Sequence, residues 1–157
     1  MAQLFNLKNI PFKPHAVTLV SGFWDLFHIG HLKAFIKFKE IGNPLVIGIL
    51  SDTACRRTKG PSRPIISEQD RAMIVSNIIH VDYVFVTPYF YIDKNGYVLR
   101  RIKPKVVVFS LGDKQPLVSN KEITFIKSKM PEINIVRVPR QSQTVSTTLL
   151  INRIKNL

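Results

Sequence analysis

The sequence predicts a three-layer α/β sandwich built around a parallel sheet of five strands. Three observations indicate this fold class: short apolar runs rich in β-branched residues, helical patterns between them, and the regular alternation of the two. Strands that alternate with helices form right-handed parallel crossovers, which place helices on both faces of the sheet. We expect the whole chain, residues 1–157, to form one domain, with residues 1–15 as an N-terminal extension.

Five short apolar runs predict the strands. They are rich in valine, isoleucine or phenylalanine, as is typical of strands that are buried on both faces of a sheet. Only the last run shows a partial alternation of apolar and polar residues. The expected strands are, in chain order, residues 16–21, 45–50, 83–86, 106–109 and 133–138.

Helical patterns lie between these runs. From Ile29 to Ile41, apolar residues recur at helical spacing among lysines, and Gly42 is well placed to end the helix. Ser67 can accept hydrogen bonds from the free N–H groups of a second helix, which we expect to end near His80. The remaining expected features are a turn at 93–96, a short helix over 98–102, a helix over 120–130 and a terminal helix capped by Ser146.

The chain carries a net charge of +13, from 23 Lys and Arg against 10 Asp and Glu. Such a charge attracts anions, including nucleotides and nucleic acids. The positive residues form local groups at 56–63 and 100–105 instead of one basic tail, and we expect the second group to be a solvated face.

Several absences in the sequence indicate a cytoplasmic protein without membrane contact. No apolar run approaches the roughly 18 residues that span a bilayer, and residues 1–15 lack the apolar stretch of an export signal. The single cysteine, Cys55, cannot form an internal disulfide, which agrees with a reducing compartment.

Three polar segments follow predicted strands: residues 22–31, 110–113 and 146–148. In parallel sheets, ligands bind beyond the carboxyl ends of the strands, at the point where the strand order reverses. We therefore expect one pocket to collect all three segments.

Two histidines mark the first of these segments. His28 and His31 flank Gly30, so both imidazoles can face one site while the glycine lets an anion approach the backbone at the helix start. Imidazole donates hydrogen bonds, and its protonated form offsets the negative charge that grows on phosphoryl oxygens during an in-line displacement. This arrangement suits a triphosphate.

Two other interpretations of the histidine pair remain open at this point. A zinc site needs a third ligand, and the other histidines, His15 and His80, do not follow predicted strands. Alternatively, the two rings are structural and satisfied by partners near a helix terminus.

The pattern Gly22-x-Trp24-Asp25-x-x-His28-x-Gly30-His31 resembles the signature of the cytidylyltransferase-like nucleotidyltransferases, with Trp24 where the family usually has Phe. Further motifs of that family follow in its order, so the resemblance covers residues 16–156. They are Ser51-Asp52, Lys59-Gly60-x-x-Arg63-Pro64, Asp70-Arg71-Ala72, Val81-Asp82, Gly112-Asp113 and Ser146-Thr147-Thr148. The resemblance implies a Rossmann-like sandwich that carries out nucleotidyl transfer.

By this resemblance, His28 and His31 would bind the nucleotide phosphates and stabilise the transition state, while Lys59 and Arg71 would neutralise phosphates of the two substrates. Hydroxyl and backbone donors at the start of the terminal helix would bind the β and γ phosphates, which the helix dipole favours. The residues expected to contact the nucleotide are Gly22, Phe23, Trp24, Asp25, Gly30, Gly112, Asp113, Arg140, Ser146, Thr147 and Thr148.

Mg²⁺ is the expected cofactor, held mainly by NTP phosphates because the chain offers few carboxylates. Asp25 belongs to the site with three tasks open: orienting a histidine, holding the first turn, or positioning Mg²⁺ through water. Gly112 and Asp113 are expected to border the base or the ribose.

The expected reaction joins the NMP part of an NTP to a phosphorylated small molecule and releases pyrophosphate. Residues 51–72 look most like the adenylyltransferase domain of bifunctional ADP-heptose synthases, which favours ATP and a sugar 1-phosphate. Residues 138–148 look more like glycerol-3-phosphate cytidylyltransferase, which favours CTP, and FAD-synthetase-like enzymes are a further alternative.

A function of another class also stays open: a nucleotide- or nucleic-acid-binding domain without catalysis. The chain lacks the aromatic and basic pattern of a known RNA-binding module, so we do not expect nucleic acid as a partner. The expected partners are an NTP, an anionic phosphorylated small molecule and a second copy of the chain in a homodimer. Residues 89–98 would contact the acceptor or the dimer partner.

Overall fold

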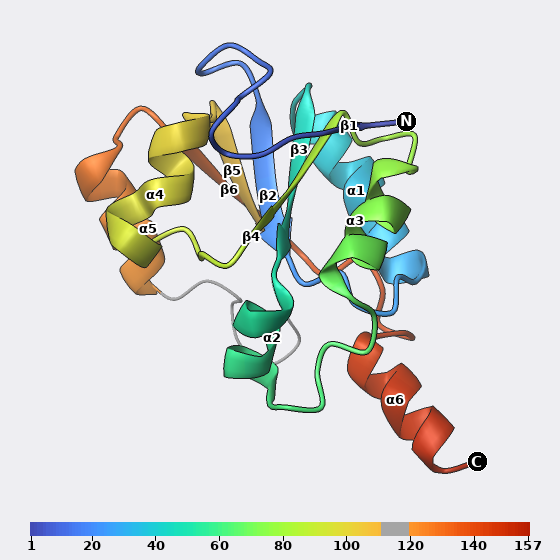
Figure 1. Cartoon of the computed structure of the whole chain (residues 1–157). Coiled ribbons are helices and arrows are strands. Elements are labelled where there is room, and N and C mark those ends of the chain that lie inside the picture. The colour runs from blue at the N-terminus through green and yellow to red at the C-terminus, as the bar shows by residue number, and fades with distance from the viewer. Residues whose placement is uncertain (111–119) are drawn as a thin grey trace.

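A six-stranded parallel sheet forms the centre of the computed structural model, which describes residues 1–110 and 120–157 (Figure 1). The strands lie in the order β1-β4-β3-β2-β5-β6, and each neighbouring pair is parallel. Their bounds are Gln3–Leu4 (β1), Thr18–Gly22 (β2), Leu45–Leu50 (β3), Tyr83–Thr87 (β4), Val106–Ser110 (β5) and Asn134–Val138 (β6). The predicted α/β sandwich is confirmed, with six strands where five were expected.

The additional strand, β1, lies in the segment that was expected to be an extension. It pairs with the edge strand β4 through only two residues, Gln3 and Leu4. Two residues are too few to show the alternation that reveals a strand in a sequence. The strand forms by pairing with the open edge of β4. Phe5 and Phe12 then pack against each other and against Tyr83 of β4, which joins the N-terminal segment to the domain.

Six helices are present among the described residues, one more than expected. They are α1 (Ile29–Ile41), α2 (Asp52–Lys59), α3 (Glu68–Ser76), α4 (Asp93–Ile102), α5 (Asn120–Lys129) and α6 (Thr147–Lys155). The unexpected one, α2, buries only Ala54 and Cys55, so its sequence has no apolar stripe that would reveal it. The second expected helix corresponds to α3 and ends at Ser76 instead of near His80.

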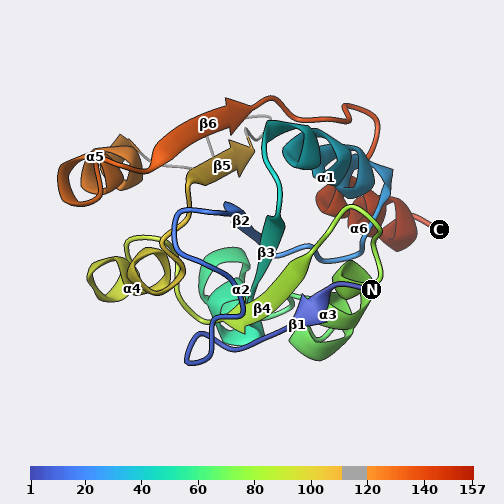
Figure 2. The ribbon, with the colours of Figure 1, turned by 90° about the horizontal axis from the view of Figure 1, so that it is seen from above.

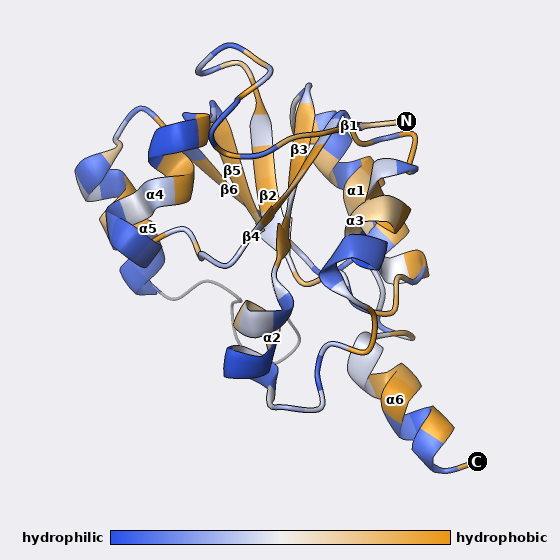
Figure 3. Ribbon diagram, viewed as in Figure 1, coloured by the Kyte–Doolittle hydropathy of each residue, from blue (hydrophilic) through white to orange (hydrophobic). Residues whose placement is uncertain are grey.

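Helices cover both faces of the sheet (Figure 2). Alternate strand residues supply two separate cores. On β3, for example, Ile47 and Ile49 belong to one core and Val46 to the other. The first core packs against α1 and α3, and the second against α4 and α5. Figure 3 shows the resulting contrast between the apolar strands and the polar outer surfaces of α4 and α5.

A left-handed turn opens α4. Lys94, Asn95 and Gly96 have φ angles of 46°, 55° and 73°, a conformation that glycine adopts without strain. A Cβ on Gly96 would also lie 2.9 Å from the Met130 side chain. The predicted turn at 93–96 is therefore confirmed, and regular helix follows it as the sequence predicted.

The second basic group is exposed, as expected, and one of its members fastens the N-terminal segment. Arg101 donates from Nε to the carbonyl of Leu7 at 2.7 Å and from Nη2 to that of Lys8 at 2.8 Å. Across the described ranges, none of the helices has the length and apolarity needed to cross a membrane.

The two halves of the sheet meet where β2 lies beside β5. β2 pairs with β3 at five positions, but it pairs with β5 only through Thr18 with Val106 and Leu19 with Val107. The two strands therefore lose their pairing toward their carboxyl ends, where the segment 22–31 begins. This is the reversal of strand order at which parallel sheets bind ligands.

Candidate active site

His28 and His31 stack on each other at the N-terminus of α1. Their ring centroids are 3.8 Å apart and their planes differ by 19°. His28 is the N-cap of the helix, and its Nδ1 accepts a hydrogen bond from the backbone N–H of Gly30 at 3.1 Å. Because an accepting nitrogen carries no proton, His28 is the neutral tautomer with its proton on Nε2. This tautomer offers the Nε2–H group to a ligand.

The pKa values of both imidazoles are lowered. Burial lowers the pKa of His28, and the positive charge of Arg140 lowers it further. Burial also lowers the pKa of His31 to about 3, with a further contribution from His28 and an opposing one from Asp25. Both rings are therefore neutral near pH 7 without a ligand.

His31 lies among aromatic rings. Trp24 meets its ring edge-on at 5.4 Å between centroids, and Phe27 lies at 5.5 Å. The Nδ1 atom of His31 is buried and has no hydrogen-bond partner within the described part of the protein. Such a polar atom is costly to leave unpaired, so a ligand that hydrogen-bonds to this ring gains from satisfying it.

The side chain of Trp24 packs against His31 from the interior of the domain. It is only 8% exposed, and its Nε1 donates to the carbonyl of Gly48 on β3 at 3.1 Å. These contacts give the Trp24 side chain a packing role, and the expected contact of this residue with the nucleotide stays a prediction. The Trp in place of the usual Phe adds one hydrogen bond between the segment 22–31 and the sheet.

Gly22 and Gly30 make room for the rings of this segment. A Cβ on Gly22 would lie 2.7 Å from the indole of Trp24. A Cβ on Gly30 would lie 2.9 Å from the ring of His28 and 3.1 Å from Cβ of Ser142. The loop before α6 therefore covers the start of α1, and Gly30 is required for that close packing.

Arg71 of α3 is completely buried. Its Nε donates to the carbonyl of Ile66 at 2.9 Å, and its Nη1 donates to the carbonyls of Leu50, at 2.9 Å, and Phe23. Its Nη2 forms an ion pair with Asp52 at 2.6 Å. The expected neutralisation of substrate phosphates by Arg71 is therefore corrected, because each guanidinium nitrogen already has a protein partner. Arg71 instead joins the ends of β2 and β3 to the starts of α2 and α3.

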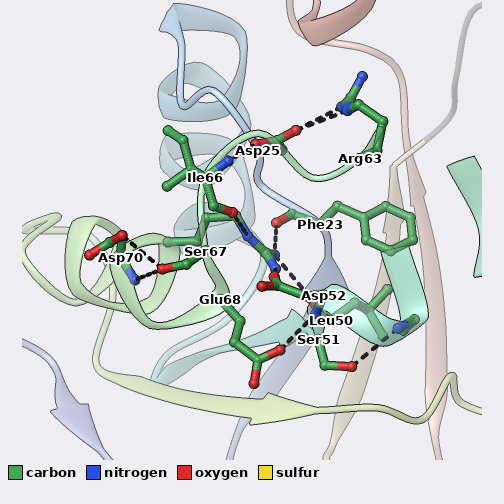
Figure 4. Close-up of polar contacts among 12 residues, drawn as sticks. Phe23, Asp25, Leu50, Ser51, Asp52, Arg63, Ile66, Ser67, Glu68 and Asp70 are labelled. Carbon is green, nitrogen blue, oxygen red and sulfur yellow. Dashed lines mark hydrogen bonds and ion pairs between the residues drawn. The ribbon is translucent and has the colours of Figure 1, made fainter. Parts of the chain in front are cut away.

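Asp25 is a second buried junction (Figure 4). Its carboxylate accepts hydrogen bonds from the backbone N–H groups of Leu26, Ile65 and Ile66 at 3.0 to 3.1 Å. It also forms an ion pair with Arg63 at 3.0 Å. Among the three tasks considered for Asp25, these contacts favour holding the first turn, because they occupy both carboxylate oxygens and none of them involves a histidine.

The start of α6 is joined to the same turn. Thr147 donates from its hydroxyl to the carbonyl of Asp25 at 2.8 Å, and Ser146 caps the helix by accepting from the N–H of Leu149 at 3.1 Å. Arg140 donates to the carbonyl of Val145 at 2.8 Å and lies close enough to His28 to lower its pKa. The first and third polar segments therefore meet at one site, as predicted, with the exposed Thr148 at its edge.

Lys59 lies at the exposed C-terminal end of α2. Burial raises the pKa of the nearby Cys55 thiol, and Lys59 and Arg63 are among the charges that oppose this shift. Lys59 thus shares its surroundings with Arg63 but stays accessible to an anion. Gly112 and Asp113, the expected neighbours of the base, lie outside the described residues.

Several residues of this region were not expected from the sequence. Glu68 accepts from the N–H of Asp52 at 2.6 Å and so caps α2, while Arg63 neutralises Asp25. Arg63 could have been found from its place in the motif Lys59-Gly60-x-x-Arg63-Pro64, whereas Glu68 has no such signal. A cavity of about 530 Å³, lined partly by His15, lies at the amino ends of the strands and includes none of the residues 22–31.

A family model described as cytidylyltransferase-like matches residues 19–153. The bifunctional protein HldE of Campylobacter concisus is 34% identical over 140 residues, which are 89% of this chain and 27% of that protein. HldE of Helicobacter pylori strain Shi470 is 32% identical over 149 residues, 95% of this chain and 30% of that protein. HldE of Syntrophotalea carbinolica is 49% identical over 70 residues, 45% of this chain and 14% of that protein. The chain thus spans less than a third of each of these relatives.

Two solved structures share the fold. A lipopolysaccharide core biosynthesis protein from Thermoplasma volcanium superposes with a TM-score of 0.66 and 21% identity, over 80% of this chain and 98% of that one. Pantoate-β-alanine ligase from Francisella tularensis superposes with a TM-score of 0.64 and 19% identity, over 100% of this chain and 74% of that one. At these identities the similarity supports the Rossmann-like architecture alone.

Replacing Arg71 by Met should lower the free energy of unfolding by about 3–5 kcal/mol, because Asp52 and three backbone carbonyls lose a buried partner. The ion-paired but 59% exposed Arg57 is the matched control, and Arg57→Met should cost no more than about 1 kcal/mol. Urea unfolding measures both. If the Arg71→Met protein is as stable as the wild type but binds nucleotide more weakly, Arg71 contacts a substrate phosphate instead.

The low pKa of His31 predicts a pH-dependent stability. Between pH 6.5 and about pH 3, unfolded His31 binds a proton that the folded protein excludes, so stability falls as the pH falls through this window. The stability advantage of the wild type over His31→Gln should therefore shrink by roughly 1 kcal/mol per pH unit below pH 6.5. Urea unfolding of both proteins at pH 7, 5.5 and 4 tests this. If the free energy of unfolding falls equally in both proteins as the pH is lowered, His31 has an ordinary pKa and the prediction is wrong.

Proposed function

The chain belongs to the cytidylyltransferase-like family of nucleotidyltransferases, and we propose that it transfers an adenylyl group from ATP to a sugar phosphate and releases pyrophosphate. The observation that carries this proposal is the stacked histidine pair at the N-terminus of α1, beside Arg140 and the start of α6. The preference for ATP and a sugar phosphate rests on the similarity of residues 51–72 to the adenylyltransferase domain of ADP-heptose synthases and on the HldE relatives.

In the proposed reaction, a phosphate oxygen of the acceptor attacks the α-phosphorus of ATP. The bond from the α-phosphorus to the bridging oxygen breaks, and pyrophosphate leaves with that electron pair. This displacement needs no covalent enzyme intermediate, since positioning and electrostatics supply most of the rate. The Nε2–H of His28 would donate to a phosphoryl oxygen, and the free N–H groups at the start of α6 would bind the outer phosphates.

Neutral imidazoles suit this task better than two permanent cations. Two protonated rings stacked at 3.8 Å would repel each other, which disfavours double protonation. A bound triphosphate favours the protonated form of a nearby imidazole, so the pair would take up positive charge only when the anion is present. The site then gains its complementary charge together with its substrate.

Mg²⁺ would enter with the NTP. Over the residues that the structure describes, no three His, Cys, Asp or Glu side chains gather in a way that could hold a metal ion. The carboxylate of Asp25 is already occupied by four protein groups, namely three backbone N–H groups and Arg63. Phosphate oxygens are ordinary ligands of Mg²⁺, and the ion would there offset charge on the leaving pyrophosphate.

A screen of pyrophosphate release tests the proposed function. Each of the four NTPs with Mg²⁺ is combined with aldose 1-phosphates, glycerol 3-phosphate or FMN, and the highest turnover is expected with ATP and an aldose 1-phosphate. Turnover mainly with CTP and glycerol 3-phosphate would favour the cytidylyltransferase alternative. Salt-sensitive RNA binding without turnover of any pair would overturn the enzyme interpretation. The expected homodimer remains a prediction for light scattering on the same sample.

Replacing His31 by Ala should lower kcat by about 10²–10³-fold, because a preorganised partner of the phosphoryl oxygens is lost. The folded protein should tolerate this change, since the Nδ1 of His31 has no hydrogen bond to lose among the described residues. His80→Ala is the matched control, because His80 lies outside the site and its loss should leave kcat unchanged. Full activity of His31→Ala would remove this histidine from the mechanism.

A further inference from the structure

Four side chains form a compact group between α2 and the segment that precedes α4. Phe23 follows β2, and its ring meets Phe90 edge-on at 6.2 Å between centroids. Arg57 of α2 lies over the ring of Phe90, with Cζ 5.6 Å from the centroid, and its Nη2 is 3.3 Å from Oδ2 of Asp93. We call Phe23, Arg57, Phe90 and Asp93 the Arg57 cluster. Phe23 was expected to contact the nucleotide, and Phe90 and Asp93 lie in the segment 89–98, which was expected to contact the acceptor or the dimer partner.

The backbone holds Phe90 and Asp93 in a fixed relation. The N–H of Phe90 donates to Oδ2 of Asp93 at 3.0 Å, and the N–H of Asp93 donates to the carbonyl of Phe90 at 3.1 Å. Between them, Tyr91 is only 5% exposed and packs edge-on against Phe109 of β5 at 5.3 Å. Tyr91 therefore anchors this turn to the sheet. Phe90 and Asp93 remain beside the segment 22–31, which we call the signature segment.

Stability does not account for the Arg57 cluster. The side chains of Arg57 and Asp93 are 59% and 31% exposed, and an ion pair in such surroundings contributes little to folding. Within the described residues, Nη2 is the only nitrogen of Arg57 with a hydrogen-bond partner. The cluster thus presents a carboxylate, two aromatic rings and guanidinium N–H groups that have no partner among the described residues. It lies beside the segment 22–31 through Phe23.

This combination matches the chemistry of a cyclic sugar. Arginine donates to hydroxyl oxygens, a carboxylate accepts from hydroxyl groups, and an aromatic ring packs against the apolar C–H face of a sugar ring. Glycerol phosphate has no ring to lie on Phe90. The large isoalloxazine of FMN lacks the hydroxyls that Asp93 would accept from at the same place.

We propose that the Arg57 cluster binds the sugar part of the acceptor and selects a cyclic, polyhydroxylated phosphate ester. Phe90 packs against the sugar ring, and the Arg57–Asp93 pair hydrogen-bonds to its hydroxyls, while the phosphate points toward His28 and Lys59. The inference rests on the proposed function, because it assigns the acceptor side of the same reaction. It also makes Arg57, Phe90 and Asp93 specificity-determining residues.

The test uses the full chain with saturating ATP and a varied aldose 1-phosphate. Asp93→Asn keeps an oxygen for the N–H of Phe90 but removes the charge, and Phe90→Ala removes the ring. Each should raise the KM for the aldose 1-phosphate about 10- to 100-fold and leave the KM for ATP within about twofold. Arg56→Ala is the matched control, because it removes an exposed positive charge from the same helix, and it should leave both values unchanged.

Exchanging the two charges distinguishes a role in binding the sugar from a role in holding α2 to α4. If Arg57 and Asp93 merely hold α2 to α4, the double variant Arg57→Asp with Asp93→Arg restores the acceptor KM together with the melting temperature. If they bind the sugar, the acceptor KM stays raised in the exchanged variant, whatever its melting temperature. An unchanged acceptor KM in Asp93→Asn and Phe90→Ala overturns the inference even when the enzyme is active.

A direct binding measurement tests the site even if no acceptor is turned over and the proposed function is wrong. Calorimetry with glucose 1-phosphate, inorganic phosphate and glycerol 3-phosphate is then compared between the wild type and Asp93→Asn. Binding of glucose 1-phosphate that exceeds the other two and weakens in the variant supports the site. Equal binding of all three, or no binding, overturns it.

Discussion

One buried guanidinium group holds the carboxyl edge of the sheet together. Arginine stays charged at every relevant pH, so its complete burial requires an opposite charge and filled donors. Asp52 supplies the charge, and the carbonyls of Phe23, Leu50 and Ile66 take the remaining hydrogen bonds. Since Phe23 directly follows β2 and Leu50 ends β3, Arg71 fixes the positions from which the segment 22–31 and α2 begin.

The signature segment depends on this arrangement through Asp25. Its carboxylate binds Arg63 and backbone N–H groups of the loop that leads to α3, while its carbonyl receives the hydroxyl of Thr147. The loop before α3, the segment between β2 and α1, and the start of α6 are therefore joined at Asp25. The histidine rings stack on each other, and His31 also packs against Trp24 and Phe27, which restricts their rotation. Electrostatic catalysis requires such preorganised groups.

The sequence allowed the parallel sheet and the meeting of the segments 22–31 and 146–148 to be predicted, because buried strands and the motifs after them are local patterns. β1 and α2 were not predictable in this way, since one has two residues and the other buries only Ala54 and Cys55. The sequence assigned Arg71 to a substrate phosphate and left three tasks open for Asp25, because a motif reveals a charged residue without revealing its partners. Whether such a charge faces a phosphate or the interior depends on contacts between segments far apart in the chain, such as Arg71 with Phe23.

The positions of the charged groups separate the two tasks of the site. Residues that hold the phosphate end, such as Asp25 and Arg71, are buried and bonded to several segments, so a change in any of them disturbs the fold as well as the site. The Arg57 cluster lies at the surface, and its members touch each other more than the core. If this cluster binds the acceptor as proposed, substitutions there would alter which acceptor is bound without moving the histidines. A phosphate site that is fixed by the interior can thus serve different acceptors, because the residues that distinguish them are free to change.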